Sequence, residues 1–454
     1  MHLHFIAIGG SAMHNLAIAL YRKGYTVTGS DDEIFEPSKS RLAACNILPE
    51  SQGWDASRIT PDIDAVILGM HAKLDNPELV RARELGLKIF SYPEYLYEQS
   101  KNKKRVVIGG SHGKTTITAM ILHVLQQAQV DCDYMVGAQL EGFDVMVKLT
   151  ESAPVMVIEG DEYLTSPIDL RPKFHLYMPD IALLSGIAWD HINVFPTFEN
   201  YVDQFRIFIS QISPGGALIY CADDTELQRI CPDARNDISI IPYTTLPYEI
   251  RNGITYLDAM GITFPLQIFG VHNLANLNGA RLVCNQLGIS DLIFYKAIQS
   301  FKGASKRLER IAKNGNRLVY KDFAHAPSKV SATLKAVREQ FPGRKVIACL
   351  ELHTYSSLNE AFLSQYEGTL DPADEAIVYF SPHALELKRL PVISEQQVKE
   401  GFRKEGLEVF TTSSLLAERL LRDKNPEAVL LLMSSGNYDG IDLKVLGEQW
   451  SNPV

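Results

Sequence analysis

A glycine-rich segment over residues 105–120, RVVIGGSHGKTTITAM, holds the residue types that a phosphate site needs. Glycines let backbone N–H groups approach an anion, Lys114 can neutralise phosphate oxygens, and the Thr115 hydroxyl at a predicted helix start can hold Mg²⁺. The loop is shorter than G-x-x-x-x-G-K-[ST], because Ile108 occupies the first glycine position. A helix capped by a glycine turn, with a surface lysine, is the alternative. We predict an ATP site that contains Gly110, Ser111, His112, Gly113, Lys114, Thr115 and Thr116.

Acidic residues and a histidine follow the next predicted strands of the same region. Glu159 comes directly after the apolar run 154–158, and His191 follows a strand predicted over 181–187. Carboxylate and imidazole groups at strand ends beside a phosphate loop can reach a cation that sits on the phosphates. An N-capping acidic cluster and an ordinary loop histidine would give the same pattern. We prefer the cation site to this alternative, and our hypothesis is that Thr115, Glu159 and His191 bind Mg²⁺.

The N-terminus predicts a second glycine turn, between a strand over 2–8 and a helix over 15–23. A further strand over 25–28 ends near an acid, as in dinucleotide-binding folds. The turn GGSAM lacks the full G-x-G-x-x-G fingerprint, so it suits any diphosphate, including that of a nucleotide sugar. The predicted contact residues are Gly9, Gly10, Ser11, Ala12, Met13, Ser30, Asp31 and His71, and His71 fits an ordinary loop equally well.

A third polar motif opens a predicted helix that runs from about residue 270 to 287. Its first turn carries His272, Asn273 and Asn276 on neighbouring positions. Two amides and an imidazole can hydrogen-bond to a purine edge. An N-cap with surface polar residues is the alternative interpretation.

Length and element order predict an α/β protein of about three domains. A polar, basic linker ends near residue 103, and a second boundary falls near residue 301. We predict a Rossmann-like domain over 1–103, a P-loop ATPase-like domain with a parallel sheet over 104–301, and a Rossmann-like domain over 302–454. Residues 236–265 are predicted to be β-rich. In the last domain we predict strands over 318–320, 345–350, 376–380, 407–410 and 428–433, with a helix over 328–341 just after Pro327.

Composition restricts the partners and the compartment. A formal charge of -10 argues against nucleic-acid binding, and no apolar run approaches the roughly 18 residues of a membrane helix. The six cysteines lack C-x-x-C spacing, which favours reduced, buried thiols. The N-terminus enters a strand directly and lacks a signal peptide. These features predict a cytoplasmic protein without nucleic-acid or membrane partners, and they leave the oligomeric state undetermined.

Seven segments, in order along essentially the whole chain, resemble the Mur ligase family of ATP-dependent amino-acid and peptide ligases of peptidoglycan synthesis. They are GGSHGKTT, IEGDEY, WDHINVF, GVHNLANLNGA, SKRLE, KDFAHAPSKV and MSSGNYDGI. The resemblance implies a UDP-sugar-binding first domain, an ATPase second domain and an amino-substrate third domain. It also implies that His272, Asn273 and Asn276 face adenine, Arg307 reaches the phosphates, Asp322 reaches the ribose, and His325 lies beside the incoming amine.

The implied reaction joins the lactyl carboxylate of UDP-N-acetylmuramate to an amine through an acyl phosphate made with ATP and Mg²⁺. Two branches of the family use this acceptor, one for L-alanine and one for a recycled murein peptide. The segment over 161–174 is similar to the peptide branch, and so is the segment over 29–37. The alanine branch typically carries Q-P-H-R-Y-T-R, whose arginines hold a small amino acid's carboxylate. Residues 351–357, ELHTYSS, have neither arginine, which favours the peptide and keeps L-alanine as the alternative.

Departures from the family pattern accompany the resemblance. His353 stands where the peptide branch usually has arginine, and Ala326 and Gly160 are smaller differences. Arg206 stands near the place of the carbamylated lysine of some other Mur ligases, so no carbamate is invoked. Two other classes of function remain as alternatives. In a nicotinamide-dependent oxidoreductase, Lys114 and the acidic residues near the phosphate loop would have no function. A non-catalytic nucleotide-binding regulator would not need Glu159 and His191.

Overall fold

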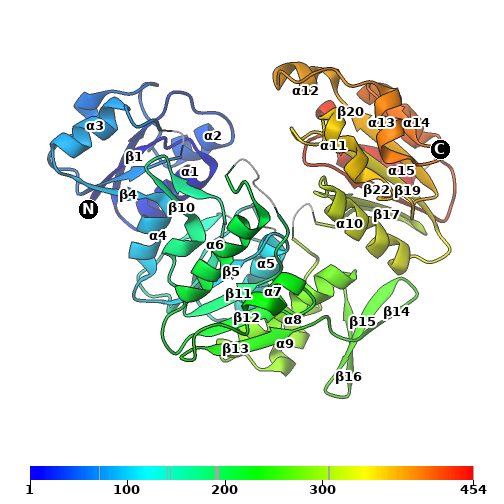
Figure 1. Ribbon diagram of the computed structural model, residues 1–454, viewed down its shortest axis with the longest axis horizontal. Helices are drawn as coiled ribbons and strands as arrows, with labels where there is room; N and C mark the ends of the chain where they lie inside the picture. The colour runs from blue at the N-terminus through cyan, green and yellow to red at the C-terminus, as the bar shows by residue number, and fades with distance from the viewer. Residues whose placement is uncertain (71, 141, 144, 190–193, 305–306, 453–454) are drawn as a thin grey trace. The chain divides into compact units, whose positions relative to one another are not determined.

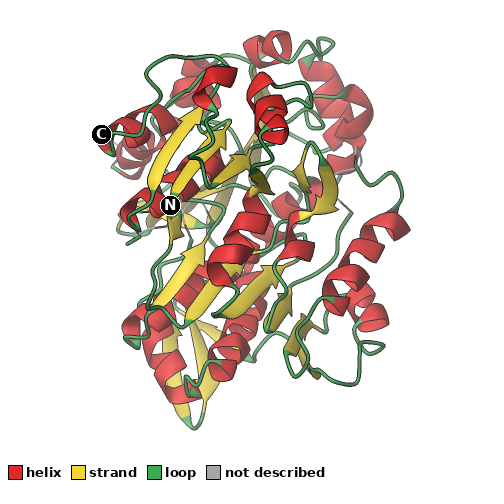
Figure 2. Cartoon of the chain, turned by 90° about the vertical axis from the view of Figure 1, so that its left-hand side faces the viewer, coloured by secondary structure: helices red, strands yellow, loops and turns green. Residues whose placement is uncertain are grey.

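The computed structural model describes residues 1–70, 72–140, 142–143, 145–189, 194–304 and 307–452. The chain divides into two compact units, Met1–Thr245 with Ala275–Ile298, and Leu246–Leu274 with Gln299–Val454. The large sheets form the inner layer of each unit and helices lie outside them, whereas the sheet over residues 248–266 has no helical layer (Figures 1 and 2). The predicted α/β class is confirmed. The boundaries predicted near 103 and 301 stay a prediction.

The first unit begins with a four-stranded parallel sheet in the order β2-β1-β3-β4. β3 has the sequence AVIL and is buried along its length, as expected for a strand covered on both faces. The strands are β1 (His2–Ile6), β2 (Thr26–Ser30), β3 (Ala65–Leu68) and β4 (Lys88–Ser91), and the helices are α1 (Ser11–Arg22), α2 (Ser38–Ala44), α3 (Pro77–Glu84) and α4 (Tyr92–Ser100).

The first glycine turn is shorter than predicted. Ser11, Ala12 and Met13 were expected in the turn, but they form the first turn of α1, with Gly10 as its N-cap. Two glycines suffice to reverse the chain, and none of the three residues that follow resists helical geometry. The N–H groups of these residues therefore belong to a helix N-terminus, which is a favourable position for an anion.

A seven-stranded sheet follows in the order β13-β12-β11-β5-β8-β6-β7, parallel except for β7 against β6. Its strands are β5 (Lys104–Gly109), β6 (Cys132–Met135), β7 (Val147–Lys148), β8 (Val155–Glu159), β11 (Ile181–Leu184), β12 (Ala217–Cys221) and β13 (Ser239–Tyr243). The helices are α5 (Lys114–Gln127), α6 (Phe198–Ser210), α7 (Thr225–Ile230), α8 (Val271–Gln286) and α9 (Asp291–Ile298), and β9 (Leu164–Ser166) pairs with β10 (Asp169–Pro172) in a separate ribbon.

The strand predicted over 181–187 ends three residues early, at Leu184. Ser185 and Gly186 turn towards the glycine loop instead of continuing the ladder. The Ser185 amide donates to the Gly109 carbonyl at 3.1 Å, and the Ser111 amide donates to the Gly186 carbonyl at 2.9 Å. The polar residue and the glycine at the end of this apolar run thus support the phosphate loop.

The second unit contains an antiparallel three-stranded sheet, β14-β15-β16, and a six-stranded sheet in the order β17-β18-β22-β19-β20-β21. The β-rich prediction for 236–265 is confirmed. The strands are β14 (Tyr248–Arg251), β15 (Ile254–Ala259), β16 (Ile262–Leu266), β17 (Glu309–Asn314), β18 (Arg317–Asp322), β19 (Lys345–Leu352), β20 (Glu375–Phe380), β21 (Glu408–Phe410) and β22 (Ala428–Met433). The helices are α10 (Pro327–Gln340), α11 (Glu360–Leu363), α12 (Pro382–Leu387), α13 (Glu395–Phe402), α14 (Ser413–Leu421) and α15 (Leu443–Ser451).

Alternate residues of the six-stranded sheet enter two separate cores. Leu318 and Tyr320 lie in the core that includes Leu334 of α10, whereas Val319 lies in the core that includes Trp450 of α15. This period of two is the strand geometry expected for a sheet covered on both faces. All strand pairs of the sheet are parallel except β17 with β18.

The thiols agree with the composition. All six cysteines are free, five are buried, and Cys45 is half-buried. Within the part of the chain that the structure describes, no helix is both long enough and apolar enough to cross a membrane.

Candidate active site

The phosphate loop lies between β5 and α5, and two glycines give it its shape. Gly110 has a φ of 126°, and an added Cβ would lie 2.2 Å from the Ser185 hydroxyl oxygen. Gly113 is left-handed, with φ 79°, and a Cβ there would lie 2.5 Å from Oδ1 of Asn276. Only glycine fits both the backbone and the space at these positions. The loop then enters α5 at Lys114, as predicted.

Lys114 lies inside the loop rather than on the surface. Its Nζ donates to the Gly110 carbonyl at 2.6 Å and forms an ion pair with Glu162 at 2.6 Å. Burial acts to lower the pKa of Lys114, but the carboxylates of Glu162, Asp161 and Glu159 outweigh it, so the pKa is raised. The ammonium is therefore charged and is held where it can meet an anion. The alternative of a surface lysine does not fit these contacts.

Thr115, in the first turn of α5, is in direct contact with Glu159 at the end of β8. The Thr115 hydroxyl donates to Oε1 of Glu159 at 2.7 Å, and the Gly137 amide donates to Oε2 at 2.9 Å. β5 and β8 pair in parallel, so their carboxyl ends meet at one edge of the sheet. His191 lies outside the described residues. Among the described residues, no group of three or more His, Cys, Asp or Glu could hold a metal ion.

A hydrogen-bond chain that the sequence did not reveal supports the loop. The Ser111 hydroxyl lies 2.9 Å from the Tyr201 hydroxyl, which donates to Glu162 at 3.2 Å. The Ala188 amide donates to the Ser111 hydroxyl at 2.9 Å. Tyr201 is on α6, far from the loop in sequence, and no motif marks it. Glu162 lies three residues after Glu159, within the segment IEGDEY, but no role was predicted for it. Of the other predicted loop residues, Thr116 is buried and His112 is exposed.

Within the α8 motif, Asn276 lies beside the loop. Asn276 is buried and faces Gly113, as the space at that glycine shows. Asn273 uses its side-chain amide to donate to the Phe269 carbonyl at 2.9 Å. His272 and Asn273 belong to the second compact unit, whereas Asn276 belongs to the first.

Three predicted residues lie around the end of β18 in the second unit. Asp322 accepts the amides of Leu308 and Ala324, each at 2.7 Å. Burial raises the pKa of this carboxyl, while the two amides and Arg307 act in the opposite direction. The Arg307 guanidinium lies 4.8 Å from the Phe323 ring centroid, and Nδ1 of His325 lies 2.8 Å from the Phe323 carbonyl. Asp322 thus holds the backbone of the segments that carry Arg307 and His325.

The N-terminal glycine turn is fastened to the end of β2. Asp31 accepts the Gly9 amide at 2.7 Å, and burial and the neighbouring Asp32 raise the pKa of Asp31 to about 6. Ser30 is fully buried and donates its hydroxyl to Glu78, which is itself fully buried. Gly10 caps α1, whose first residues are Ser11, Ala12 and Met13. His71 lies outside the described residues.

Models of three protein families match successive parts of the chain. They are the "Mur ligase family, catalytic domain" over residues 2–104, the "Mur ligase middle domain" over 108–284 and the "Mur ligase, glutamate ligase domain" over 306–436. Together they match the predicted order of three α/β regions.

Relatives at the level of the whole chain agree. A UDP-N-acetylmuramate–L-alanine ligase of Sulfurihydrogenibium sp. (strain YO3AOP1) is 30% identical, over 96% of this chain and 95% of that protein. The crystal structure of UDP-N-acetylmuramate-alanine ligase from Thermotoga maritima gives a TM-score of 0.70 at 20% identity, over 97% of this chain and 96% of that chain.

A second type of Mur ligase is also similar. The crystal structure of UDP-N-acetylmuramate:L-alanyl-gamma-D-glutamyl-meso-diaminopimelate ligase from Neisseria meningitides gives a TM-score of 0.60 at 26% identity, over 66% of this chain and 98% of that chain. The phosphate loop has the geometry described above, and the family models and relatives together match nearly the whole chain. This protein therefore belongs to the Mur ligase family and is an ATP-dependent ligase that forms amide bonds.

Proposed function

We propose that the protein joins the lactyl carboxylate of UDP-N-acetylmuramate to the amine of an alanyl group. The observation that carries this proposal is the contact of Thr115 with Glu159 at 2.7 Å, beside the half-buried Lys114 ammonium. This arrangement supplies a cation, a hydroxyl and a carboxylate where a nucleoside triphosphate would meet the loop amides. The name of the Sulfurihydrogenibium relative supports the acceptor.

Lys114 and the loop amides would act by neutralising charge. A carboxylate is a poor electrophile at neutral pH, and phosphorylation by ATP gives it a leaving group that the amine then displaces as phosphate. Phosphoryl transfer needs positioning and charge stabilisation more than covalent help from the protein. The described contacts of Nζ, to Gly110 and Glu162, use two of its three donor positions. One donor is left for a phosphate oxygen.

Thr115 and Glu159 suit a magnesium ion. Both offer the hard oxygen ligands that Mg²⁺ prefers, and in proteins the ion keeps waters and phosphate oxygens as its other ligands. A Cβ at Gly137 would lie 3.0 Å from Oε1 of Glu159, so glycine keeps the space beside this carboxylate clear. The residues present therefore fit the ion, which when bound would offset the charge of the β- and γ-phosphates. We propose His191, outside the described residues, as a further ligand.

Residues of the other regions would hold the remaining substrates. We propose the turn at Gly9 and Gly10, with the start of α1, for the diphosphate of the UDP-sugar, since helix N-termini favour anions. His325, at the carboxyl end of β18, is proposed to lie beside the amine. These substrates are cytoplasmic metabolites, so the cytoplasm is the proposed compartment.

Two amine donors have separate support. Free L-alanine is favoured by the names of the Sulfurihydrogenibium and Thermotoga relatives, one of them 30% identical over nearly the whole chain. The names of these relatives therefore favour L-alanine over the peptide, which the sequence analysis had preferred. The recycled peptide L-Ala-γ-D-Glu-diaminopimelate is favoured by residues 351–357, which lack both arginines that would hold a small amino acid's carboxylate. Either donor gives the same lactyl–alanyl bond.

Phosphate release tests the proposal directly. The protein is incubated with Mg-ATP and UDP-N-acetylmuramate, together with L-alanine or with the tripeptide. Release that depends on both the muramate nucleotide and one of the amines is expected, with a product of the corresponding mass. ATP hydrolysis that ignores the muramate nucleotide would reject the proposed acceptor.

A further inference from the structure

Tyr201 on α6 places its hydroxyl between the phosphate loop and Glu162. The hydroxyl oxygen lies 2.9 Å from Oγ of Ser111 and 3.2 Å from Oε1 of Glu162. Tyr201 is fully buried and Glu162 is 2% exposed, so bulk water does not compete for these groups. The ring packs against Phe205 and Phe195, with centroids 5.3 and 5.4 Å away. This aromatic packing holds the hydroxyl at a fixed position beside the loop.

The hydrogen bonds around Tyr201 can run in only one direction. Glu162 forms an ion pair with Lys114, and its carboxylate can only accept hydrogen bonds. Tyr201 therefore gives its single proton to Glu162, and its oxygen accepts the proton of the Ser111 hydroxyl. The Ser111 oxygen in turn accepts the Ala188 amide at 2.9 Å. A backbone amide at one end and a carboxylate at the other thus orient the whole chain of hydrogen bonds.

Both hydrogen-bond donors of Ser111 are used inside the protein. Its amide donates to the Gly186 carbonyl at 2.9 Å, and its hydroxyl donates to Tyr201. The sequence analysis placed Ser111 among the ATP-site residues because it lies in the glycine loop. With these two contacts made, Ser111 has no donor left for a phosphate oxygen, so its effect on a nucleotide passes through its neighbours.

The two carboxylate oxygens of Glu162 serve different partners. Oε2 pairs with the Lys114 ammonium at 2.6 Å, whereas Oε1 accepts the Tyr201 hydroxyl. A donor on Oε1 draws negative charge away from Oε2 and keeps the carboxylate in one orientation. Without that donor, Glu162 would hold Lys114 more strongly and would be free to turn. The tyrosine hydroxyl therefore sets how much of the ammonium charge is available to a phosphate.

We propose that Tyr201 and Ser111 are positioning residues for Lys114. Through one oriented chain of hydrogen bonds they hold Glu162, and Glu162 holds the ammonium where it meets the phosphates of ATP. Neither of the two side chains touches the nucleotide. This inference rests on the proposed function, in which the loop binds ATP.

Tyr201→Phe removes the hydroxyl and keeps the ring. Titration calorimetry of the full-length protein with the non-hydrolysable ATP analogue AMP-PNP and Mg²⁺ measures the dissociation constant, and circular dichroism checks the fold. Binding is expected to be about tenfold or more weaker than in the wild type, because a buried carboxylate loses a hydrogen bond. Tyr177→Phe is the matched control: Tyr177 is also fully buried, but its hydroxyl has no hydrogen-bond partner among the described residues. This variant should bind the analogue as the wild type does.

Ser111→Ala tests whether the serine acts through Tyr201. If it does, Ser111→Ala alone weakens binding of the analogue, and the double variant Ser111→Ala/Tyr201→Phe binds no more weakly than the weaker single variant. If the serine held a phosphate directly, the two losses would multiply in the double variant. A general loss of stability would also affect Tyr177→Phe and would not produce this non-additivity.

Lys114→Ala is measured in parallel, because it tests the ATP site itself. If this variant keeps the wild-type affinity for the analogue, the proposed ATP site fails and the inference fails with it. If Lys114→Ala loses affinity but Tyr201→Phe does not, the positioning role of Tyr201 is wrong. If the losses of Ser111→Ala and Tyr201→Phe multiply, Ser111 does not act through the tyrosine.

Discussion

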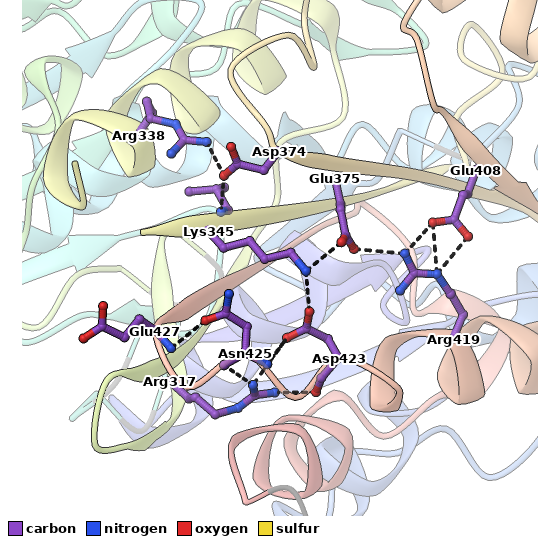
Figure 3. Close-up of polar contacts among 11 residues, drawn as sticks. Arg317, Arg338, Lys345, Asp374, Glu375, Glu408, Arg419, Asp423, Asn425 and Glu427 are labelled. Atoms are coloured by element: carbon purple, nitrogen blue, oxygen red, sulfur yellow. Dashed lines mark hydrogen bonds and ion pairs between the residues drawn. The ribbon is translucent and has the colours of Figure 1, made fainter. Parts of the chain in front are cut away.

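The phosphate loop and a network of ion pairs in the second unit both contain paired charges, yet they differ in what surrounds these charges. We call the second group the amino-edge network, because it lies where the strands of the six-stranded sheet begin; it consists of Arg317, Arg338, Lys345, Asp374, Glu375, Glu408, Arg419 and Asp423 (Figure 3). At the loop, Lys114 pairs with Glu162 next to two glycines with positive φ angles, Gly110 and Gly113. In the network, Arg317 and Lys345 both pair with Asp423, beside strands that are hydrogen-bonded to their neighbours in the sheet. An ion pair alone therefore does not indicate a function. A charged pair beside an open loop can exchange its partner for a ligand, whereas a pair between strands holds the sheet together.

The largest expected effect is on stability, in the network. Asp423→Ala leaves the buried Arg317 without its carboxylate, which should reduce the free energy of unfolding by about 3–5 kcal/mol. Urea unfolding followed by circular dichroism measures it. Glu408→Gln is the control, because it removes a half-exposed pair with Arg419 and should cost less than about 1 kcal/mol. Equal losses in the two variants would contradict the role of burial.

Lys114→Ala should abolish most ligation without unfolding the protein. Loss of one preorganised charge at a developing negative centre costs about 10²–10³-fold in kcat. Phosphate release measures the rate, and circular dichroism checks the fold. Lys104→Ala, at the other end of β5, is the control and should retain activity. Near-normal turnover by the Lys114 variant would remove this lysine from the mechanism.

Gly113→Ala should reduce ligation about tenfold or more. The new Cβ would approach Oδ1 of Asn276 to 2.5 Å at a φ of 79°, so Asn276 or the strained loop must shift beside the phosphate site. The KM for ATP is the sensitive measure. Gly215→Ala has nearly the same φ, 76°, but its Cβ would meet no atom within 4 Å. An equal KM change in both variants would show that strain at a glycine, not this contact, matters.

The smallest expected effect is the pH dependence of the network. Burial acts to raise the pKa of Asp374, but Arg338 outweighs it, so the pKa lies below its ordinary value. This carboxylate therefore stabilises the fold above the unfolded pKa of about 4, and the contribution is lost as the pH falls through the folded pKa. Asp374→Asn should lower stability by under about 1 kcal/mol at pH 7 and less at pH 3. Thermal melts at both pH values measure the difference, and an unchanged gap would argue against this pairing.

Several elements were predictable because their cause is local. Pro327 begins α10, and the glycine loop ends where α5 begins, as chain-local rules for helix starts predict. The first glycine turn was predicted to include Ser11–Met13, which in fact begin α1. The helix propensity of these three residues is compatible with both a turn and a helix. The strand over 181–187 was also predicted too long, because Ser185 bonds a loop that is distant in sequence.

The sequence by itself determined the phosphate loop, because glycine, lysine and threonine at fixed spacing act through local backbone geometry. It also indicated the order of α/β regions, and the resemblance of its seven segments pointed to the family. Only the tertiary structure showed that Tyr201 and Glu162 support the loop, and that Asp322 holds its neighbouring segments. It alone showed that each cation of the amino-edge network is paired with a carboxylate. Charge pairing depends on which strand lies beside which, and that arrangement follows from packing over long sequence separations.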